Sequence, residues 1–317
     1  MKRIEVREHG SEEVLQPAEA GPGEAGPGEA GPGQLRIDIH AAGVNPADTY
    51  IRAGNYEFLQ PRLPFTPGCD AAGVVTGTGS GVTGFSNGDR VWISTLPGRT
   101  LGTYSETIVC DAGLAHKLPG HLSFAEGAAL GIPYTTAYRA LFQRGRARPG
   151  ETELVHGASG GVGIPTVQLA AAHGLKVIGT AGTPAGRELV TQCGAVHALD
   201  HTAPGYLSRL KDLTDGRGVD LVVEMLANRN LQEDLNVLAR NGRVVIVGSR
   251  GPVEINPRSL MAAEAVVRGT ALWNMGPGDF EETYAALDRL LESRAIRPVV
   301  GKQFPLAEAA AAHRFIA

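Results

Sequence analysis

The feature that most constrains the fold is a regular alternation of strand-like and helix-like segments after residue 150. Six short runs have the composition of buried strands: Thr152 to His156, Lys176 to Thr180, Val196 to Leu199, Val219 to Glu224, Arg243 to Gly248 and Val266 to Leu272. The helical segments between them are Ile164 to His173, Ala185 to Cys193, Tyr206 to Leu213 and Leu231 to Ala239. Because parallel strands need crossover connections, this alternation predicts an α/β fold with a doubly wound parallel sheet covered on both faces.

The first part of the chain has a different residue pattern. It contains short β-like runs bounded by Gly, Asn, Asp and Pro: Ile4 to Val6, Leu35 to His40, Ala71 to Val75, Arg90 to Ile93 and Thr107 to Val109. Such spacing is typical of a small, β-rich, barrel-like domain. Helical stretches then begin after Ser123, at Phe124 to Leu130 and Thr135 to Gln143.

These residue patterns predict that the chain divides into three parts. We expect a β-rich domain over 1–122 and a nucleotide-binding domain over 123–265. The part over 266–317 would supply the last strand, a helix at Phe280 to Arg294, and a return to β structure at Pro298 to Val300.

A tandem repeat interrupts the β-rich part. Glu-Ala-Gly-Pro-Gly occurs three times from Glu19 through Gly33. Proline removes a backbone donor and glycine costs backbone entropy, so the repeat cannot form a packed element. We interpret it as a flexible surface loop between two strands, with a partner-binding segment as the less favoured interpretation.

Charge and cysteine content limit the function classes. A net charge of -4 argues against a surface built for phosphate backbones, although it leaves room for a local basic patch. The three cysteines, Cys69, Cys110 and Cys193, are far apart and favour reduced thiols. No export signal is found and no run approaches the ~18 apolar residues of a membrane helix, so we expect a cytoplasmic protein without a membrane partner.

A glycine-rich segment follows the first predicted strand. It runs from His156 through Gly163 and reads His-Gly-Ala-Ser-Gly-Gly-Val-Gly. Ala158 occupies the first position of G-x-G-x-x-G, which leaves A-x-G-x-x-G with Gly160 and Gly163. Gly160 would let the backbone approach a pyrophosphate, and Gly163 would let the helix pack closely on the strand. A simple tight turn is the alternative, but the position between a strand and a helix favours a dinucleotide site.

The end of the next strand bears on the choice of dinucleotide. An NAD site usually has Asp or Glu there to bind the ribose 2′-hydroxyl. The segment Ile178 to Pro184 contains no acidic residue before Glu188, which favours NADPH. Lys176, Arg187 and Arg250 are candidate partners for the 2′-phosphate, or else ordinary surface cations.

Motifs for a metal or an activated nucleophile were sought as well. The sequence has no H-E-x-x-H, no C-x-x-C and no close Cys/His cluster, so we expect no metal and assign His116 and His313 to the surface or to caps. Gly79-Ser80-Gly81 is a turn between β runs and not a nucleophile elbow. The chemistry should therefore come from the cofactor.

Several motifs carry a family resemblance. They are Ala42 to Asp48, Thr49 to Gly54, Pro64 to Gly73, Gly88 to Val91, His156 to Gly163, Glu224 to Asn228 and Val247 to Gly251. Together they resemble the zeta-crystallin type of NADPH:quinone oxidoreductase, within the medium-chain dehydrogenase/reductase superfamily, from about Leu35 to His313. Zinc-dependent relatives have Gly-His-Glu at Gly68-Cys69-Asp70 and a four-cysteine lobe that is lacking here. Both differences are typical of the zinc-free branch.

The resemblance implies a fold, a cofactor and a set of site residues. The fold would be a GroES-like β-barrel domain and a six-stranded Rossmann domain with NADPH in the cleft between them, assembled as a homodimer or homotetramer. Asn45 and Tyr56 would be catalytic and face the nicotinamide and the substrate. The cofactor-binding residues would be Tyr50, Ser159, Gly160, Gly161, Val162, Gly182, His201, Asn230, Val247, Gly248, Ser249, Arg250, Thr270, Ala271 and Leu272. From the sequence alone, Tyr50 and Tyr56 fit interdomain packing equally well, and His201 could be an ordinary loop residue.

Two features depart from the family. Relatives have a single short Pro/Gly turn where this chain has the triplicated repeat, and a surface loop should tolerate that expansion. Relatives also continue beyond Ala317 with the end of a helix and a closing strand, so the resemblance implies a shortened carboxyl end. Loss of an edge strand would expose unpaired backbone groups and apolar surface, which could weaken stability or assembly.

We therefore expect an enzyme that reduces quinones with NADPH and without zinc. The resemblance points to ortho-quinones, and to one-electron transfer that releases a semiquinone. A 2-enoyl or alkenal reductase on the same fold is the nearest alternative. A crystallin role or binding of AU-rich RNA is the alternative from another class. The net charge of -4 argues against the RNA binding. An inactive fragment or isoform is a further alternative.

Overall fold

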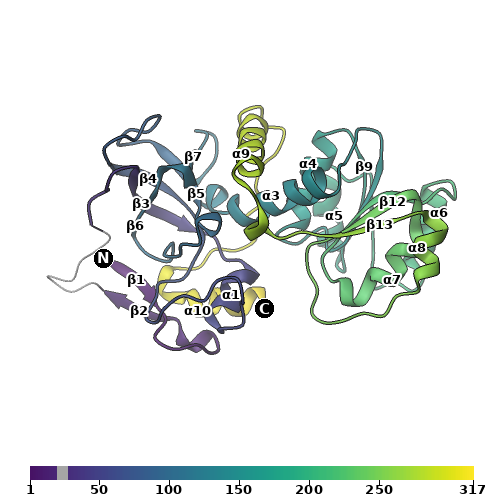
Figure 1. The fold of residues 1–317 in the computed structure, drawn as a ribbon, viewed down its shortest axis with the longest axis horizontal. Coiled ribbons are helices and arrows are strands. Elements are labelled where there is room, and N and C mark those ends of the chain that lie inside the picture. Colours follow the sequence, from purple (N-terminus) through teal and green to yellow (C-terminus); the bar gives the residue numbers. More distant parts are fainter. Residues whose placement is uncertain (20–27) are drawn as a thin grey trace. The chain divides into compact units, whose positions relative to one another are not determined.

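The structure is a computed structural model that describes residues 1–19 and 28–317. The chain divides into two units, shown with their labelled elements in Figure 1. The first unit comprises Met1–Ile132 and Pro298–Ala317, and the second comprises Pro133–Arg297. The boundaries therefore differ from those expected at 122/123 and 265/266.

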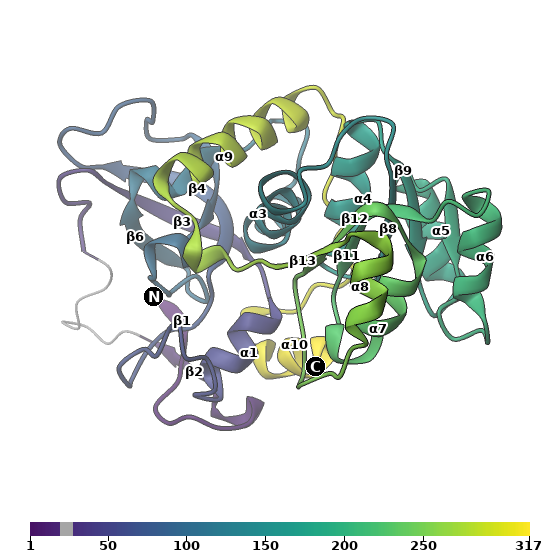
Figure 2. The same cartoon turned by 45° about the vertical axis from the view of Figure 1, so that its right-hand side comes forward.

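The second unit is built on a six-stranded parallel sheet, which confirms the predicted doubly wound fold (Figure 2). Its strands are β8 (Thr152–Val155), β9 (Lys176–Thr180), β10 (His197–Leu199), β11 (Val219–Glu224), β12 (Leu238–Ile246) and β13 (Val266–Gly269). The spatial order is β10-β9-β8-β11-β12-β13. The order reverses between β8 and β11, so their carboxyl ends flank the switch point where ligands bind in open α/β sheets.

Helices cover both faces of this sheet. On one face lie α4 (Gly163–Ala172) and α5 (Pro184–Gln192), and on the other lie α6 (Tyr206–Leu213), α7 (Ala227–Val237) and α8 (Pro257–Ala263). Right-handed crossovers produce this division, because the chain moves outward from β8 in one direction and then returns to continue in the other. The unit also contains most of α3 (Gly131–Tyr138), a π-helical turn (Arg139–Arg144) and α9 (Pro277–Glu292).

Several predicted boundaries in this unit are wrong. The helix expected to end at Ala239 ends at Val237, and β12 already begins at Leu238. Leu238 pairs with Val219 across a register shift, which a periodicity argument cannot detect. Strand β13 ends at Gly269 instead of Leu272, and the helix α8 was not predicted.

The first unit contains a five-stranded antiparallel sheet, as expected for the GroES-like barrel. In spatial order the strands are β6 (Thr107–Asp111), β3 (Gln34–Ala42), β4 (Asp70–Thr78), β5 (Arg90–Ser94) and β7 (Ala115–Lys117). Strands β1 (Lys2–Glu5) and β2 (Gln16–Glu19) form a separate antiparallel pair. The helices are α1 (Pro46–Arg52), α2 (Phe124–Ala128) and α10 (Ala309–Ile316). Alternate residues such as Leu35, Ile37 and Val75 form the core of the larger sheet.

The repeat lies between β2 and β3, as predicted, although its residues 20–27 fall outside the described residues. The carboxyl end differs from expectation. Residues 298–300 form no strand, and the chain ends instead in α10, which belongs to the first unit.

Neither of the two histidines assigned to the surface or to caps is exposed, and His116 is half-buried. His313 is 1% exposed. His116 lies in β7, where its ring stacks on Trp92 with centroids 4.5 Å apart, and burial lowers its pKa to about 4. The cysteines are free thiols, as predicted. None of the helices in the described ranges has the length and apolar character needed to cross a membrane.

Candidate functional site

The glycine-rich loop joins β8 to α4 at the carboxyl edge of the parallel sheet. Gly157 has a φ of +56° and makes the tight turn, so Ala158 in the first motif position needs no glycine. The Ala158 amide donates to the Thr180 carbonyl (2.8 Å), and the Gly157 amide donates to Thr180 Oγ1 (3.2 Å). Both bonds fix the loop to the end of β9.

The glycines of the loop differ in what surrounds them. A Cβ atom at Gly163 would lie 2.2 Å from the carbonyl oxygen of Gly157, so this position must be glycine for α4 to pack on the loop. At Gly161 a Cβ would have no neighbour within 4 Å, and at Gly160 its only neighbour would be the Gly157 oxygen at 3.2 Å. Packing within the chain therefore does not require glycine at 161. The open position at Gly161, just before a helix amino terminus, fits the approach of a dinucleotide pyrophosphate.

The other predicted cofactor residues of the second unit follow the carboxyl ends of other strands. Gly182 follows β9, His201 follows β10, Val247 to Arg250 follow β12, and Thr270 to Leu272 follow β13. Asn230 lies in the first turns of α7, after β11. Because parallel strands end at one edge of the sheet, the fold brings these residues to that edge together with the loop.

Two local contacts support this grouping. A Cβ at Gly182 would lie 3.2 Å from the ring of His201, so the turns after β9 and β10 are adjacent. Thr270 and Ala271 border a cavity of about 400 Å³ whose other walls include Arg139 and Arg144. Tyr50, in contrast, lies on α1 of the first unit.

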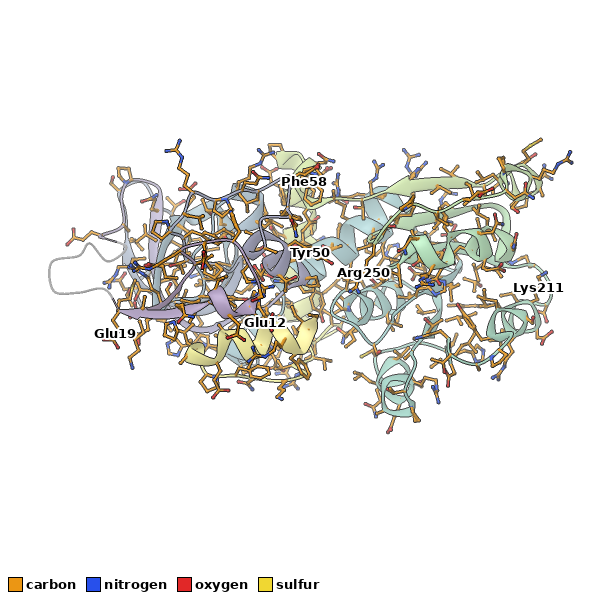
Figure 3. All side chains as sticks on the ribbon, turned by 90° about the horizontal axis from the view of Figure 1, so that it is seen from below. Glu12, Glu19, Tyr50, Phe58, Lys211 and Arg250 are labelled. Atoms are coloured by element: carbon orange, nitrogen blue, oxygen red, sulfur yellow. The ribbon has the colours of Figure 1, made fainter. Side chains whose placement is uncertain are left out.

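The candidates for binding a 2′-phosphate differ in position. Lys176 is the first residue of β9 and therefore lies at the amino edge, opposite the loop, which rules out that role. Arg187 is paired with Asp200 (2.8 Å). Arg250, which is labelled in Figure 3, is exposed after β12. Its amide donates to Asn228 Oδ1 (2.8 Å). Arg250 is thus the candidate with the most suitable position.

In the first unit, buried carboxyl groups hold Asn45 in place. Its Nδ2 donates to Asp70 Oδ2 (2.9 Å), and its backbone amide donates to Asp48 Oδ2 (2.8 Å). Asp70 also accepts from Ser94 Oγ (2.9 Å) and from the Ile132 amide (2.8 Å). The asparagine amide is therefore fixed in both position and orientation.

Burial dominates the electrostatics around Asn45. It raises the pKa of Asp48 to about 7, with the nearby Asp70 charge adding to the effect and the Asn45 amide opposing it. Burial raises the pKa of Asp70 to about 6, although three hydrogen bonds stabilise its charged form. Burial also raises the pKa of the Cys69 thiol well above its usual range. Asp48 and Asp70 lie within the motifs Ala42 to Asp48 and Pro64 to Gly73, but no local sequence pattern predicts that they surround Asn45.

Aromatic side chains are available close to Asn45 in the sequence. Tyr50 and Phe58 are 43% and 47% exposed, and both are labelled in Figure 3. Tyr56 packs edge-on against Phe58 with centroids 5.8 Å apart, and burial raises the pKa of its hydroxyl. The Tyr56 hydroxyl therefore stays protonated at neutral pH and is able to donate a hydrogen bond.

A cluster of buried polar side chains in the second unit was not predicted. His156, Glu224 and Asp234, which we call the buried triad, bring one potential ligand atom each within 4.8 Å of one another. His156 follows β8 and Glu224 ends β11, which are neighbouring strands. The strand assignments alone could have placed these two side chains together, whereas Asp234 in α7 has no such signal.

Comparisons with known proteins agree with this arrangement. Residues 161–292 match the family described as zinc-binding dehydrogenase, and residues 31–120 match the alcohol dehydrogenase GroES-like domain. The quinone oxidoreductase of Rattus norvegicus is 45% identical over 317 residues, which cover 100% of this chain and 94% of that protein.

Solved structures also resemble the chain over its whole length. The Escherichia coli quinone oxidoreductase complexed with NADPH has a TM-score of 0.85 at 32% identity, covering 100% of this chain and 96% of that one. A mycobacterial structure complexed with NADPH has a TM-score of 0.85 at 31% identity, with the same coverage of 100% and 96%.

Proposed function

Because this chain belongs to the quinone oxidoreductase family of the medium-chain dehydrogenase/reductase superfamily, we propose that it reduces quinones, ortho-quinones in particular, with NADPH. The observation that carries the proposal is the carboxyl edge of the six-stranded sheet. There the open position at Gly161 lies just before α4, and the residues that directly follow β9 include no acid that would select NAD.

The residues at this edge fit the parts of a dinucleotide. Gly160 and Gly161 would admit the pyrophosphate, with Ser159 and Val162 beside them in the loop. Gly182, His201 and Arg250 would surround the adenosine ribose and its 2′-phosphate. The remaining contacts would come from Asn230, Val247 to Ser249 and Thr270 to Leu272, with Tyr50 from the first unit. NADPH supplies reducing equivalents when bound, and the protein supplies orientation.

Asn45 and Tyr56 are the proposed catalytic residues. A carbonyl oxygen gains negative charge as a quinone is reduced, and fixed hydrogen-bond donors stabilise that charge without reorganising. The hydrogen bond from Asn45 to Asp70 fixes the amide in advance, and the protonated Tyr56 hydroxyl can donate. These two groups would orient the substrate oxygen.

We propose that the reaction is zinc-independent. Asp70 and Cys69 occupy the positions where zinc-dependent relatives have ligands. Both Asp70 oxygens already accept hydrogen bonds, from Asn45, Ser94 and the Ile132 amide. Among the described residues, neither Cys69 nor Asp70 belongs to a group of three or more His, Cys, Asp or Glu side chains close enough together to hold a metal ion. The donor set therefore does not fit zinc.

The test follows NADPH oxidation with 9,10-phenanthrenequinone as acceptor and NADH as a parallel donor. We expect turnover with NADPH and much weaker use of NADH. Arg250→Ala should reduce that preference, and the exposed Arg258→Ala on α8 serves as its control. Equal use of both donors would overturn the NADPH assignment. Faster turnover of a 2-alkenal than of the quinone would favour the alkenal reductase.

The first reduction product separates one-electron from two-electron reduction. One-electron transfer reduces two quinones per NADPH and releases two semiquinones, which then disproportionate to quinone and quinol. Two-electron transfer reduces one quinone per NADPH directly to a quinol. We propose the one-electron outcome, and the absence of a semiquinone signal in electron paramagnetic resonance during the first anaerobic turnovers would contradict it.

We also propose that the chain forms a homodimer or homotetramer. Strand β13 lies at the edge of the six-stranded sheet, where an unpaired backbone is available to another copy. Nearby, Met261 is 74% exposed and Val266 is 41% exposed. Light scattering after gel filtration tests this proposal, and a monomer at micromolar concentration would contradict it.

A further inference from the structure

The buried triad has no place in the function proposed so far, although it brings three buried titratable side chains within 4.8 Å of one another. His156 Nε2 lies 2.8 Å from Asp234 Oδ1 and 3.5 Å from Glu224 Oε2. All three side chains are almost fully buried, and Asp234 Oδ2 has no hydrogen-bond partner among the described residues. Two carboxylates and a neutral imidazole in such a place would carry an uncompensated charge of -2, which is unfavourable in a low-dielectric interior.

Retained protons remove this charge. Burial raises the pKa of Glu224 and of Asp234 to about 7, and it lowers the pKa of His156. The other titratable groups nearby are Tyr206 on α6, whose pKa burial raises to about 12, and Glu233 on α7, which adds negative charge. No cation of the described residues is in contact with either carboxyl group except a protonated His156. The triad therefore keeps at least one carboxyl proton near neutral pH.

The triad is connected to the cofactor residues through Glu224. Its Oε1 accepts hydrogen bonds from the Leu226 amide and from Asn230 Nδ2, the latter at 3.1 Å. The backbone carbonyl of Glu224 accepts from the Val247 amide (2.8 Å). One residue thus fixes the proposed cofactor contact Asn230 and the turn that begins at Val247.

We propose that the buried triad is a proton-sharing cluster that positions Asn230 for NADPH, and that loss of the shared proton weakens NADPH binding. The inference rests on the proposed function. When the proton leaves, a second negative charge appears beside a site that must accept an anionic dinucleotide, and Coulomb repulsion opposes binding. The charge also changes the hydrogen bonds that Glu224 makes to Asn230. His156, Glu224 and Asp234 are positioning residues in this scheme.

The decisive variant is Asp234→Asn. An asparagine oxygen can still accept the hydrogen bond from His156, but the side chain cannot ionise. The measurement is the NADPH dissociation constant, by nicotinamide fluorescence, at pH 6 and at pH 8.5. We expect this constant to rise with pH in both proteins, and the rise in wild type to be about 3- to 10-fold larger than the rise in Asp234→Asn. The ratio of the two constants at each pH cancels the titration of the NADPH phosphate itself.

A matched control makes the same chemical change elsewhere. Asp288 on α9 also has a pKa raised by burial, to about 6, and it lies outside the carboxyl edge. Asp288→Asn should keep the wild-type pH dependence. If Asp234→Asn does not fold, Glu224→Gln removes the same ionisation and replaces it in the comparison.

The outcomes are distinct. Parallel pH profiles for wild type and Asp234→Asn would overturn the inference while leaving NADPH binding established. Failure of the wild-type protein to bind NADPH at any pH would overturn the proposed function. A pH dependence that disappears when a chelator is added would show that the triad binds a metal ion, and would also overturn the proton-sharing interpretation.

Discussion

Asn45 illustrates how single residues depend on their neighbours, because its amide is fixed by Asp70 and its backbone by Asp48. Asn45→Ala should lower kcat for quinone reduction about 10- to 100-fold, since a fixed hydrogen-bond donor to the developing oxyanion is lost. NADPH binding should change little. Steady-state kinetics and fluorescence titration measure the two effects separately.

The control for Asn45 is Ser94→Ala. This variant removes another hydrogen bond to Asp70 but no proposed catalytic group. Its kcat should stay near that of the wild type. Equal losses in both variants would mean that Asn45 only supports Asp70.

Glu153 is a buried residue whose effect on stability should depend on pH. It is fully buried in β8, and neither carboxyl oxygen has a hydrogen-bond partner among the described residues. Burial raises its pKa well above the usual value of 4.5, so the folded state disfavours ionisation. Stability is therefore lost as the pH rises above the unfolded pKa. Glu153→Gln should be more stable than wild type by about 1–3 kcal/mol at pH 8, and by less at pH 5.

Urea unfolding at both pH values measures this difference. Glu151→Gln is the comparison, because Glu151 forms an ion pair with Arg243 (2.6 Å) and its loss should not stabilise the protein. A wild type as stable as Glu153→Gln at pH 8 would contradict the argument.

At the scale of elements, two glycines of the loop between β8 and α4 have different roles: Gly163 is needed for packing, and Gly161 for cofactor binding. Gly163→Ala should destabilise the second unit by about 1–3 kcal/mol, because its Cβ would overlap the Gly157 carbonyl. Gly161→Ala should leave stability unchanged, because no atom of the described chain lies within 4 Å of the new Cβ. It should still weaken NADPH binding about 10-fold or more by occupying the space of the pyrophosphate. Thermal unfolding and NADPH titration of both variants test this, and tight NADPH binding by Gly161→Ala would contradict it.

The elements also show which parts of the fold and of the site can be predicted from the sequence. The strands of the parallel sheet are predicted because each is a short apolar run between helical segments. The edge residues outside the glycine-rich loop, in contrast, come from the family resemblance. The start of β12 was missed because it depends on a register shift against β11. The surroundings of Asn45 were missed because Asp70, Ser94 and Ile132 come from separate elements, and no local pattern joins them.

At the scale of the whole chain, the carboxyl-terminal segment completes the first unit. After Arg297 the chain leaves the second unit, and Ala309 of α10 packs with Ile4, Val6 and Tyr104 in one apolar cluster. The first unit is therefore discontinuous in sequence. The resemblance implies a return to this domain, but it does not predict that a buried histidine, His313, belongs to the returning segment.

His313 on α10 links this segment to the rest of the first unit. Its Nδ1 accepts a hydrogen bond from Arg52 (3.1 Å), because a guanidinium can only donate. Nε2 therefore carries the proton and donates to the Tyr104 hydroxyl (3.0 Å). Protonation of Nδ1 would destroy the bond from Arg52 and place two cations together. This geometry accounts for the direction of the His313 pKa, which burial, with the Arg52 charge adding to it, lowers to about 4.

The lowered pKa of His313 predicts how stability depends on pH. In the unfolded state the histidine has a pKa near 6.5 and is protonated below that pH, whereas His313 in the folded state stays neutral down to about pH 4. Stability therefore falls as the pH drops from about 6.5 toward 4. His313→Gln can accept from Arg52 and donate to Tyr104 without titrating. Between pH 7.5 and pH 5 it should lose roughly 1–2 kcal/mol less unfolding free energy than wild type. Urea unfolding measures this, with the exposed His197→Gln as control. If wild type and His313→Gln lose the same unfolding free energy between pH 7.5 and pH 5, the hydrogen bonds of neutral His313 do not stabilise the contact between α10 and the rest of the first unit.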